Sequence, residues 1–335
     1  MRCPQHSPGN QCGDSKLAHW APRFWKLMPN QSASRGEGPW PTSNELRSVR
    51  AWFVRRAGLG DSRESDSAVR LVFDCVSGMS RMERITVPWR ASESELERLA
   101  LLADRLQVGE PVQYAVGTTS FAGLLFKCDS RALIPRPETE ELLMESLHRV
   151  QLPSADNSLR MLDVGTGSGI LSIAWKSRRP GDEVHGLDVE SGALELATAN
   201  AERLGCVVDF HRTDILQPQP ADGVFAVPFD VILSNPPYIP PADRSDMLPT
   251  VSDWEPSTAL FVESEDSLLF YRRIIEGCQN ENWLAPGGLL ALECHRDATA
   301  QVLDLIPESW AAKDRLKDLQ GNWRMVFARQ SEPTD

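Results

Sequence analysis

Apolar residues recur at intervals of three and four through residues 42–108, which is the spacing of one face of an α-helix. Ser43 is the expected N-cap of the first helix, and Gly78 is expected to end the second. The three apolar stripes are Leu46, Val49, Trp52 and Phe53; Ala68, Leu71, Val72 and Cys75; and Leu96, Leu99, Leu102 and Leu106. The pattern predicts a small all-α domain.

From residue 159 onward, short β-branched runs alternate with amphipathic segments, which is typical of a parallel sheet covered by helices. The predicted strands are Arg160–Val164, Glu183–Val189, Val207–Arg212, Phe229–Ser234 and Leu289–Glu293, and the predicted helices are Ile170–Ser177, Gly192–Leu204 and Ser267–Cys278. Residues 316–319 and 323–329 flank Gly321-Asn322 and predict an antiparallel hairpin at the sheet edge. The fold class is therefore α/β, a doubly wound sheet with a small all-α N-terminal domain.

Composition narrows the classes of partner. The length of 335 residues suits two domains, and the net charge of −12 argues against a surface built to grip a nucleic-acid backbone. The seven cysteines are scattered without a Cys-x-x-Cys pair, so neither a metal site nor a disulfide framework is expected. Apolar runs are far shorter than a membrane helix needs. We expect a monomer that binds neither a membrane nor nucleic acid directly.

Residues 1–41 differ from the rest of the chain because they are rich in proline, poor in acidic residues and without a hydrophobic period. We expect a disordered leader or a start codon assigned too early, with Met28 as an alternative start. No apolar core of a secretory signal is present in this stretch. The expected location is the cytoplasm, and the mitochondrial matrix is the alternative if the leader is a transit peptide.

A glycine-rich turn joins the first predicted strand of the sheet to the helix that follows. The stretch is Leu162-Asp163-Val164-Gly165-Thr166-Gly167-Ser168-Gly169. Its glycines allow a tight turn and a close approach of backbone to a ligand, and Asp163 can hydrogen-bond a polar or cationic group. A dinucleotide, S-adenosylmethionine or a plain tight turn would all fit. The glycine spacing differs from that of NAD sites, which makes NAD less expected, and it excludes a P-loop.

Acidic residues follow the next two predicted strands. Asp188 stands about 20 residues after the glycine turn, where an acid typically binds the ribose hydroxyls of an adenosine cofactor. Asp214 follows the third strand and is placed to receive an adenine amino group. Each acid alone could cap a helix, but three acids at successive strand ends beside a glycine turn favour a cofactor site.

The most specific motif is Asn235-Pro236-Pro237-Tyr238, at the end of the apolar strand Phe229–Ser234. Two prolines remove two backbone donors and fix φ, so carbonyl groups there are free to accept hydrogen bonds. Asn235 adds an amide oxygen, and Tyr238 adds an aromatic face. Together they can hold a planar –NH2 group, with two acceptors for its hydrogens and a ring over its plane.

These motifs resemble the release factor glutamine methyltransferases (the HemK or PrmC family), which depend on S-adenosylmethionine. Further stretches that continue the resemblance are Gly109–Tyr114, Phe121–Gly123, Leu133–Glu140, Trp254-Glu255-Pro256, Tyr271–Ile274, Leu290–Glu293 and Asp318–Gly321. The likeness covers about Thr42 to Arg329. It implies a helical substrate-docking domain over residues 42–108, a linker hairpin over 109–135 and a seven-stranded catalytic domain over 136–330.

The resemblance also implies roles for single residues. S-adenosylmethionine would be held by Asp163, Gly165, Thr166, Gly167, Ser168, Gly169, Asp188, Asp214, Ile215 and Asn235; the glutamine would be bound by Asn235, Pro236, Pro237, Tyr238 and Phe121, with Asn235, Pro236 and Tyr238 as the catalytic set. Phe121 and the Arg136–Glu140 segment would form a wall over the cofactor. The substrate would be the glutamine of the Gly-Gly-Gln tripeptide in class I peptide-chain release factors.

The sequence departs from the family pattern at three places. Ile215 stands where many members carry an aromatic residue beside the adenine. Glu293-Cys294-His295-Arg296 replaces a glycine-containing turn, and Glu263–Asp266 replaces a glycine-rich stretch. The last two are expected to lie outside the chemical centre. Two rival functions stay open: methylation of adenine N6 in nucleic acid, and a binding module without catalysis.

Overall fold

The computed structural model describes residues 40–150, 158–220 and 222–332 of the 335-residue chain. These residues form two compact units, which divide between Val116 and Gly117. The expectations about the leader concern residues 1–41, of which residues 1–39 lie outside the described part. The segment expected as a linker, residues 109–135, is divided between the two units.

The described N-terminal unit consists of helices around its own core. They are α2 (Leu46–Arg56), α3 (Arg63–Ser77), α4 (Arg81–Thr86), α5 (Glu93–Gln107) and α6 (Val112–Val116). The three predicted apolar stripes correspond to α2, α3 and α5, whereas α4 and α6 were not predicted. Val49, Phe53, Val72 and Leu99 are fully buried in this core, and the rings of Phe53 and Phe73 meet edge to face at 5.6 Å.

Local capping explains where these helices begin and end. Ser80 and Ser92 form reciprocal capping boxes with acidic residues three positions later, and Gly78 ends α3 in the left-handed conformation, as predicted. The prediction that Ser43 caps the first helix is wrong. Glu45 occupies the N-cap of α2, and the Ser43 hydroxyl instead accepts the backbone N–H of Glu45 at 3.2 Å.

The C-terminal unit contains a small hairpin and a seven-stranded sheet. The hairpin strands are β1 (Thr118–Phe121) and β2 (Leu124–Lys127); the sheet strands are β3 (Arg160–Val164), β4 (Glu183–Asp188), β5 (Asp209–Arg212), β6 (Phe229–Ser234), β7 (Leu284–Glu293), β8 (Ala312–Lys317) and β9 (Trp323–Arg329). The order across the sheet is β5-β4-β3-β6-β7-β9-β8. β9 runs antiparallel to both of its neighbours, and the other pairs are parallel. The predicted doubly wound methyltransferase-like fold is confirmed.

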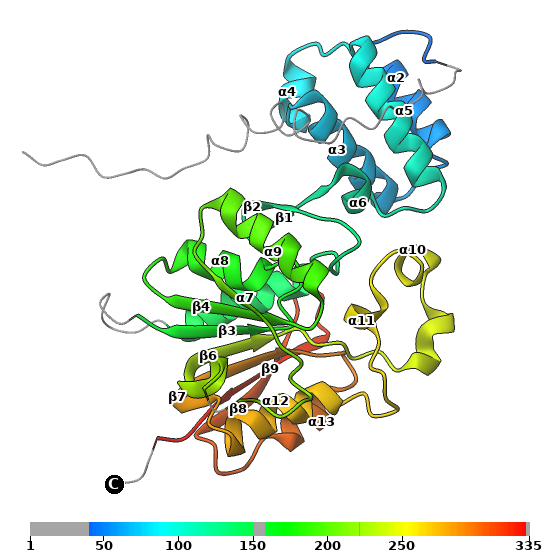
Figure 1. The fold of residues 1–335 in the computed structure, drawn as a ribbon. Coiled ribbons are helices and arrows are strands. Elements are labelled where there is room, and N and C mark those ends of the chain that lie inside the picture. Colours follow the sequence, from blue (N-terminus) through cyan, green and yellow to red (C-terminus); the bar gives the residue numbers. More distant parts are fainter. Residues whose placement is uncertain (1–39, 151–157, 221, 333–335) are drawn as a thin grey trace, which may run out of the picture. The chain divides into compact units, whose positions relative to one another are not determined.

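Helices cover both faces of this sheet (Figure 1). One face carries α7 (Pro137–Arg149), α8 (Ile170–Arg178) and α9 (Ser191–Leu204); the other carries α12 (Leu269–Asn280) and α13 (Thr299–Leu305). Shorter turns are η2 (Val224–Ala226), η3 (Pro241–Asp246), α10 (Pro249–Ser252) and α11 (Ser257–Leu260). Alternate strand residues pack on opposite faces: Met161 and Val231 lie on the α8 side, while Leu162 and Ile232 lie on the α12 side. This double burial explains why the central strands β3 and β6 are mostly apolar.

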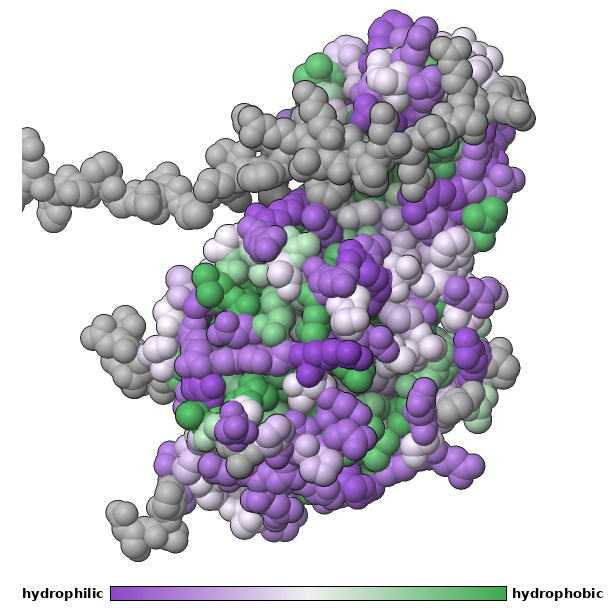
Figure 2. Space-filling model, in the orientation of Figure 1, coloured by the Kyte–Doolittle hydropathy of each residue, from purple (hydrophilic) through white to green (hydrophobic). Residues whose placement is uncertain are grey.

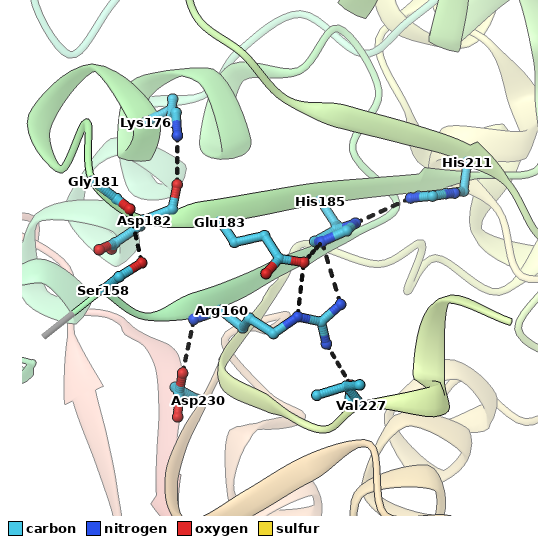
Figure 3. A network of polar contacts seen from close by, with 10 residues as sticks. All are labelled: Ser158, Arg160, Lys176, Gly181, Asp182, Glu183, His185, His211, Val227 and Asp230. Atoms are coloured by element: carbon cyan, nitrogen blue, oxygen red, sulfur yellow. Dashed lines mark hydrogen bonds and ion pairs between the residues drawn. The ribbon is translucent and has the colours of Figure 1, made fainter. Parts of the chain in front are cut away.

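Polar contacts tie the amino-terminal ends of the central strands together (Figure 3). Arg160 Nε donates to Glu183 Oε1 at 2.8 Å, and the Arg160 backbone N–H donates to Asp230 Oδ2 at 2.7 Å. The His185 ring lies 2.7 Å from the same Glu183 oxygen and stacks on the ring of His211 at 5.3 Å. The contacts of Arg160 join β3, β4 and β6 near their amino-terminal ends, away from the glycine turn and the Asn-Pro-Pro-Tyr motif, and the contact between His185 and His211 extends the network to β5.

Hydrophilic residues occupy much of the face that Figure 2 shows, and smaller hydrophobic areas lie between them. Within residues 40–150, 158–220 and 222–332, every helix is too short or too polar to cross a membrane.

Candidate active site

The two chemical motifs meet at the point where the strand order reverses. The chain proceeds from β3 outward to β4 and β5, then returns to β6 on the other side of β3. Val164 at the end of β3 is paired with Ser234 at the end of β6, and the Ser234 hydroxyl donates to the Val164 carbonyl at 2.7 Å. Ligands of doubly wound sheets bind in the crevice outside such a switch point. The glycine turn and Asn235 therefore lie together at the end of the sheet where a ligand is expected.

The glycine turn is folded back onto the end of β4. The N–H groups of Gly165 and Thr166 both donate to the Leu187 carbonyl, at 2.9 and 2.7 Å. Gly165 has a φ of +75°, and a side chain placed there would meet open space. Gly169 has a φ of +81°, but a Cβ there would come within 2.7 Å of Ile173. Gly165 thus leaves the backbone open to a ligand, whereas Gly169 permits close helix packing.

Asp163 has an unused acceptor beneath this turn. Its side chain is 1% exposed, and its Oδ2 accepts from the Thr166 hydroxyl at 2.7 Å and from the Ser172 N–H at 3.2 Å. Its other oxygen, Oδ1, is buried without a hydrogen-bond partner among the described residues. Burial raises the pKa of Asp163 to about 6. A buried acceptor left open in this way suits a ligand donor, and it fits the positively charged amino group of S-adenosylmethionine.

Asp188 connects the glycine turn to the end of β4. Its Oδ2 accepts the Gly167 N–H at 2.9 Å, and its Oδ1 accepts the Glu190 N–H at 3.0 Å. Each carboxylate oxygen can take a second donor, so the pair of oxygens can still bind two hydroxyl groups. The carboxyl is half-buried, and this burial raises its pKa. The open positions leave room for the contact with a ribose, which stays a prediction.

Asp214 and Ile215 form the turn after β5. Asp214 Oδ1 accepts the Leu216 N–H at 2.9 Å, so its carboxylate closes its own turn. Ile215 is 7% exposed and packs in the core on the α12 side of the sheet. The structure therefore gives Ile215 a core role, and its contact with an adenine ring stays a prediction.

Asn235 is anchored through its own side chain. Its Nδ2 donates to the Thr139 hydroxyl of α7 at 3.2 Å. Downstream, Ile239 resumes pairing: its N–H donates to the Leu260 carbonyl, and its carbonyl accepts from Val262. The Asn-Pro-Pro-Tyr segment is therefore held at both ends.

Tyr238 lies half-buried against the core on the α12 side. Its ring centre is 5.9 Å from that of His295, with the planes tilted by 44°. Burial raises the pKa of Tyr238 to about 12, so the phenol stays neutral at physiological pH. Tyr238 can offer a ring face to a substrate but does not serve as a base.

Glu293 corrects one of our expectations. The Glu293–Arg296 turn was expected outside the chemical centre, yet Glu293 Oε2 accepts from the Thr139 hydroxyl at 2.6 Å, and Thr139 in turn accepts from Asn235. Both Thr139 and Glu293 are almost completely buried. Sequence reasoning missed their pairing, although an acid ending the apolar strand Leu289–Glu293 was a usable signal.

Glu255 joins the segment after the motif to the start of α7. Its side chain is buried; Oε1 accepts from Arg136 Nη2 at 2.6 Å, and Oε2 accepts the Ile134 N–H at 3.0 Å. A buried carboxylate that accepts hydrogen bonds from an arginine and from a backbone N–H makes a strong, charge-assisted contact. It fixes the first turn of α7, which carries Thr139.

Phe121 does not lie where the resemblance placed it. It is 2% exposed and packs edge to face on Phe126 at 6.2 Å, inside the core between the hairpin and the sheet. The next residue, Ala122, donates its N–H to Glu140 of α7 at 2.9 Å. Phe121 therefore supports α7 from the core side, and it offers no exposed surface to a substrate.

Comparisons with known proteins identify the family to which the chain is similar. A family model described as "Methyltransferase small domain" matches residues 139–248. The chain is 38% identical over 239 residues to the release factor glutamine methyltransferase of Bacteroides thetaiotaomicron, covering 71% of this chain and 81% of that protein. Proteins of the same name from Flavobacterium psychrophilum and Chlorobaculum tepidum are 32% and 36% identical; each match covers 84% of this chain, and 98% and 95% of those proteins.

Proposed function

The chain belongs to the release factor glutamine methyltransferase family, and on that premise we propose that it methylates the side-chain amide nitrogen (N5) of a glutamine in class I peptide-chain release factors. The methyl donor is S-adenosylmethionine. The target is the glutamine of the Gly-Gly-Gln tripeptide. The observation that carries the proposal is the anchored Asn235 amide beside the glycine turn, at the ends of two adjacent strands.

The residues around the glycine turn would hold the cofactor. Asp163 Oδ1 would receive its amino group, Asp188 would receive its ribose hydroxyls, and the open backbone at Gly165 would lie against it. Asp214 is the candidate acceptor for the adenine amino group. When bound, the cofactor supplies a methyl group activated by a positive sulfur.

The Asn-Pro-Pro-Tyr segment would bind and activate the glutamine amide. An amide nitrogen is a poor nucleophile because its lone pair is delocalised into the carbonyl. The Asn235 Oδ1 and the Pro236 carbonyl would accept its two hydrogens and hold the nitrogen with its lone pair toward the methyl group. Pro237 fixes the backbone, and the Tyr238 ring covers the amide plane. Both acceptors strengthen as positive charge develops on nitrogen, which is preferential binding of the transition state.

The proton leaves the nitrogen after the new C–N bond has formed. Tyr238 stays protonated because its pKa is raised to about 12. The Glu293 carboxyl is already bonded to Thr139. We therefore assign the proton to water rather than to a base in the site.

The test is incubation with isotope-labelled S-adenosylmethionine and a purified class I release factor, followed by mass mapping of the label. We expect one methyl group on the Gly-Gly-Gln glutamine and none when that glutamine is replaced by alanine. Asn235→Ala should lower turnover by roughly 10²–10³, the scale of losing one preorganised transition-state hydrogen bond. Label on adenine of added DNA or RNA, or unchanged turnover in a folded Asn235→Ala protein, would refute the proposal.

We also propose that the enzyme acts as a monomer on a protein partner, without direct contact to nucleic acid or a membrane. The cytoplasm is the proposed location, because the relatives described above are bacterial proteins; the mitochondrial matrix is the alternative. The N-terminal unit is the proposed docking element for the release factor, because the pocket for one side-chain amide offers little area for specificity.

A further inference from the structure

Three side chains from separate parts of the fold form one hydrogen-bonded row. Asn235 follows β6, Thr139 lies in the first turn of α7, and Glu293 ends β7. The Asn235 Nδ2 donates to Thr139 Oγ1 at 3.2 Å, and the same hydroxyl donates to Glu293 Oε2 at 2.6 Å. Thr139 is 2% exposed and Glu293 is 3% exposed. Bulk water therefore has little access to the inner two members.

Counting hydrogens fixes the direction of this row. An ionised carboxylate can only accept, and a threonine hydroxyl carries a single hydrogen. With Glu293 ionised, that hydrogen is committed to Oε2, so Thr139 can only accept from Asn235. The –NH2 end of Asn235 must then face Thr139, and its carbonyl oxygen must face the other way. The orientation of an asparagine amide is otherwise ambiguous. Here it is set by the negative charge of Glu293, which is connected to Asn235 through two hydrogen bonds.

We propose that Glu293 is a positioning residue that, through Thr139, presents the carbonyl oxygen of Asn235 to the methyl-accepting amide. The inference rests on the proposed function and extends it, because it assigns the orientation of the acceptor to a residue that touches neither substrate nor cofactor. The opposite orientation would turn the Asn235 –NH2 group toward the –NH2 group of the glutamine. Two donors would then face each other, and the transition-state hydrogen bond would be lost.

Protonation of Glu293 removes the constraint. A protonated carboxyl can donate to the Thr139 oxygen, and the Thr139 hydroxyl is then free to donate its own hydrogen to the carbonyl oxygen of a reversed Asn235 amide. Burial raises the pKa of Glu293 to about 7, and its bond from Thr139 opposes that rise. The productive orientation is therefore held above this pH and released below it.

The charges around Glu293 come from each element packed against it. Glu138 on α7 raises its pKa, whereas Arg324 on β9 and Arg136 beside α7 lower it. Tyr271 of α12 donates its hydroxyl to the Glu293 backbone carbonyl at 3.1 Å. His295 and Tyr238 also lie close by, and the pKa of His295 is lowered by its burial. A titration of the row must therefore be assigned with variants of Glu293 itself.

The first measurement is turnover at saturating concentrations of both substrates from pH 5.5 to 8.5, with the full chain. The wild type should lose turnover on the acid side with a midpoint near 7. Glu293→Gln keeps the shape of the side chain but cannot ionise. The decrease of turnover at acidic pH should therefore be absent in this variant, and its turnover at pH 8 should be several-fold lower than that of the wild type. Thr139→Val should reduce turnover roughly 10–100-fold, and Thr139→Ser, which retains the hydroxyl, should restore most of it. Cofactor affinity, measured by calorimetry, should stay within about two-fold of wild type in all three variants.

A second measurement does not depend on activity. In ¹⁵N-labelled protein without substrate, the side-chain –NH2 signals of Asn235, assigned by their loss in Asn235→Ala, should shift with pH with a midpoint near 7 in the wild type and stay constant in Glu293→Gln. The same acid limb or the same shift in Glu293→Gln would overturn the inference. So would full turnover in Thr139→Val. If the wild type fails to methylate a release factor while the Asn235 signals still follow Glu293, the proposed function fails and the positioning contact stands.

Discussion

Replacement of Asp188 by alanine tests whether the end of β4 binds the cofactor. Two of the four acceptor positions on the Asp188 carboxylate are taken by the N–H groups of Gly167 and Glu190, at 2.9 and 3.0 Å. The remaining positions are available to ribose hydroxyls. A hydrogen bond to a charged group contributes about 1.5–3 kcal/mol. Loss of even one such bond should weaken S-adenosylmethionine binding by roughly 10–150-fold, and alanine removes every contact of the carboxylate.

The Asp188→Ala substitution should lower the thermal stability of the free protein less than that of the complex with the cofactor. Burial raises the pKa of Asp188, which means that desolvation makes its ionised form costly before any ligand arrives. Removing the carboxylate relieves that cost while it breaks two backbone contacts. We therefore expect a small change in the thermal stability of the free protein and a large loss of the stabilisation that the cofactor adds.

Calorimetric titration with S-adenosylmethionine and thermal unfolding with and without it separate these effects. Asp209→Ala is the matched control, because Asp209 is an exposed acid at the amino-terminal end of the neighbouring β5; its cofactor affinity should equal that of the wild type. Wild-type affinity in a folded Asp188→Ala protein would place the ribose contact elsewhere. If Asp188→Ala lowers stability equally with and without cofactor, Asp188 stabilises the glycine turn and does not contact the cofactor.

Three further outcomes follow from the structure. Gly169→Ala should destabilise the protein by about 1–3 kcal/mol in urea unfolding, because its Cβ would lie 2.7 Å from Ile173 at a φ of +81°; unchanged stability would show that helix packing there is loose. Burial raises the pKa of Asp163 from 3.8 to about 6, so its contribution to folding is greatest below pH 4 and is lost, by up to about 3 kcal/mol, as pH rises through 6. The difference in unfolding free energy between wild type and Asp163→Asn should therefore change over that range, and a constant difference would contradict the shift. Deletion of residues 1–41 should leave methylation nearly unchanged, whereas deletion through Val116 should abolish methylation of intact release factor while cofactor binding persists; full methylation by the longer deletion would exclude docking by the N-terminal unit.

Strands with a mostly apolar run were predicted with the bounds that they have in the structure, whereas interrupted runs were predicted with shifted bounds. Phe229–Ser234 was predicted with the bounds that β6 has in the structure, since five of its six residues are buried. β7 begins at Leu284 rather than Leu289, because Pro286 and two glycines break the pattern although the backbone still pairs. Pro137 begins α7 at its first position, where proline needs no partner for a missing N–H.

The site was predictable as far as each motif acts locally. The turn at Gly165 and the acid Asp188 follow strand ends, so their placement at one edge follows from the parallel sheet. The contact between Thr139 and Glu293 spans 154 residues and joins a helix to a strand that is not its sequence neighbour. Its partners are set by how α7 packs on the sheet, which a residue pattern does not specify. The burial of Phe121 was missed for the same reason.

The position of β9 between β7 and β8 bears on how the chain is made. Ribosomes synthesise β7 well before β9, so the outer edge of β7 has no strand to pair with until residues 323–329 have emerged. During that interval the growing polypeptide presents an open, apolar strand edge, the feature most prone to pairing with other chains. Glu293 lies on that edge and pairs with Met325. The strands that carry the glycine turn and Asn235 precede β7 in the sequence, so they can pair with each other before β9 covers the edge that carries Glu293.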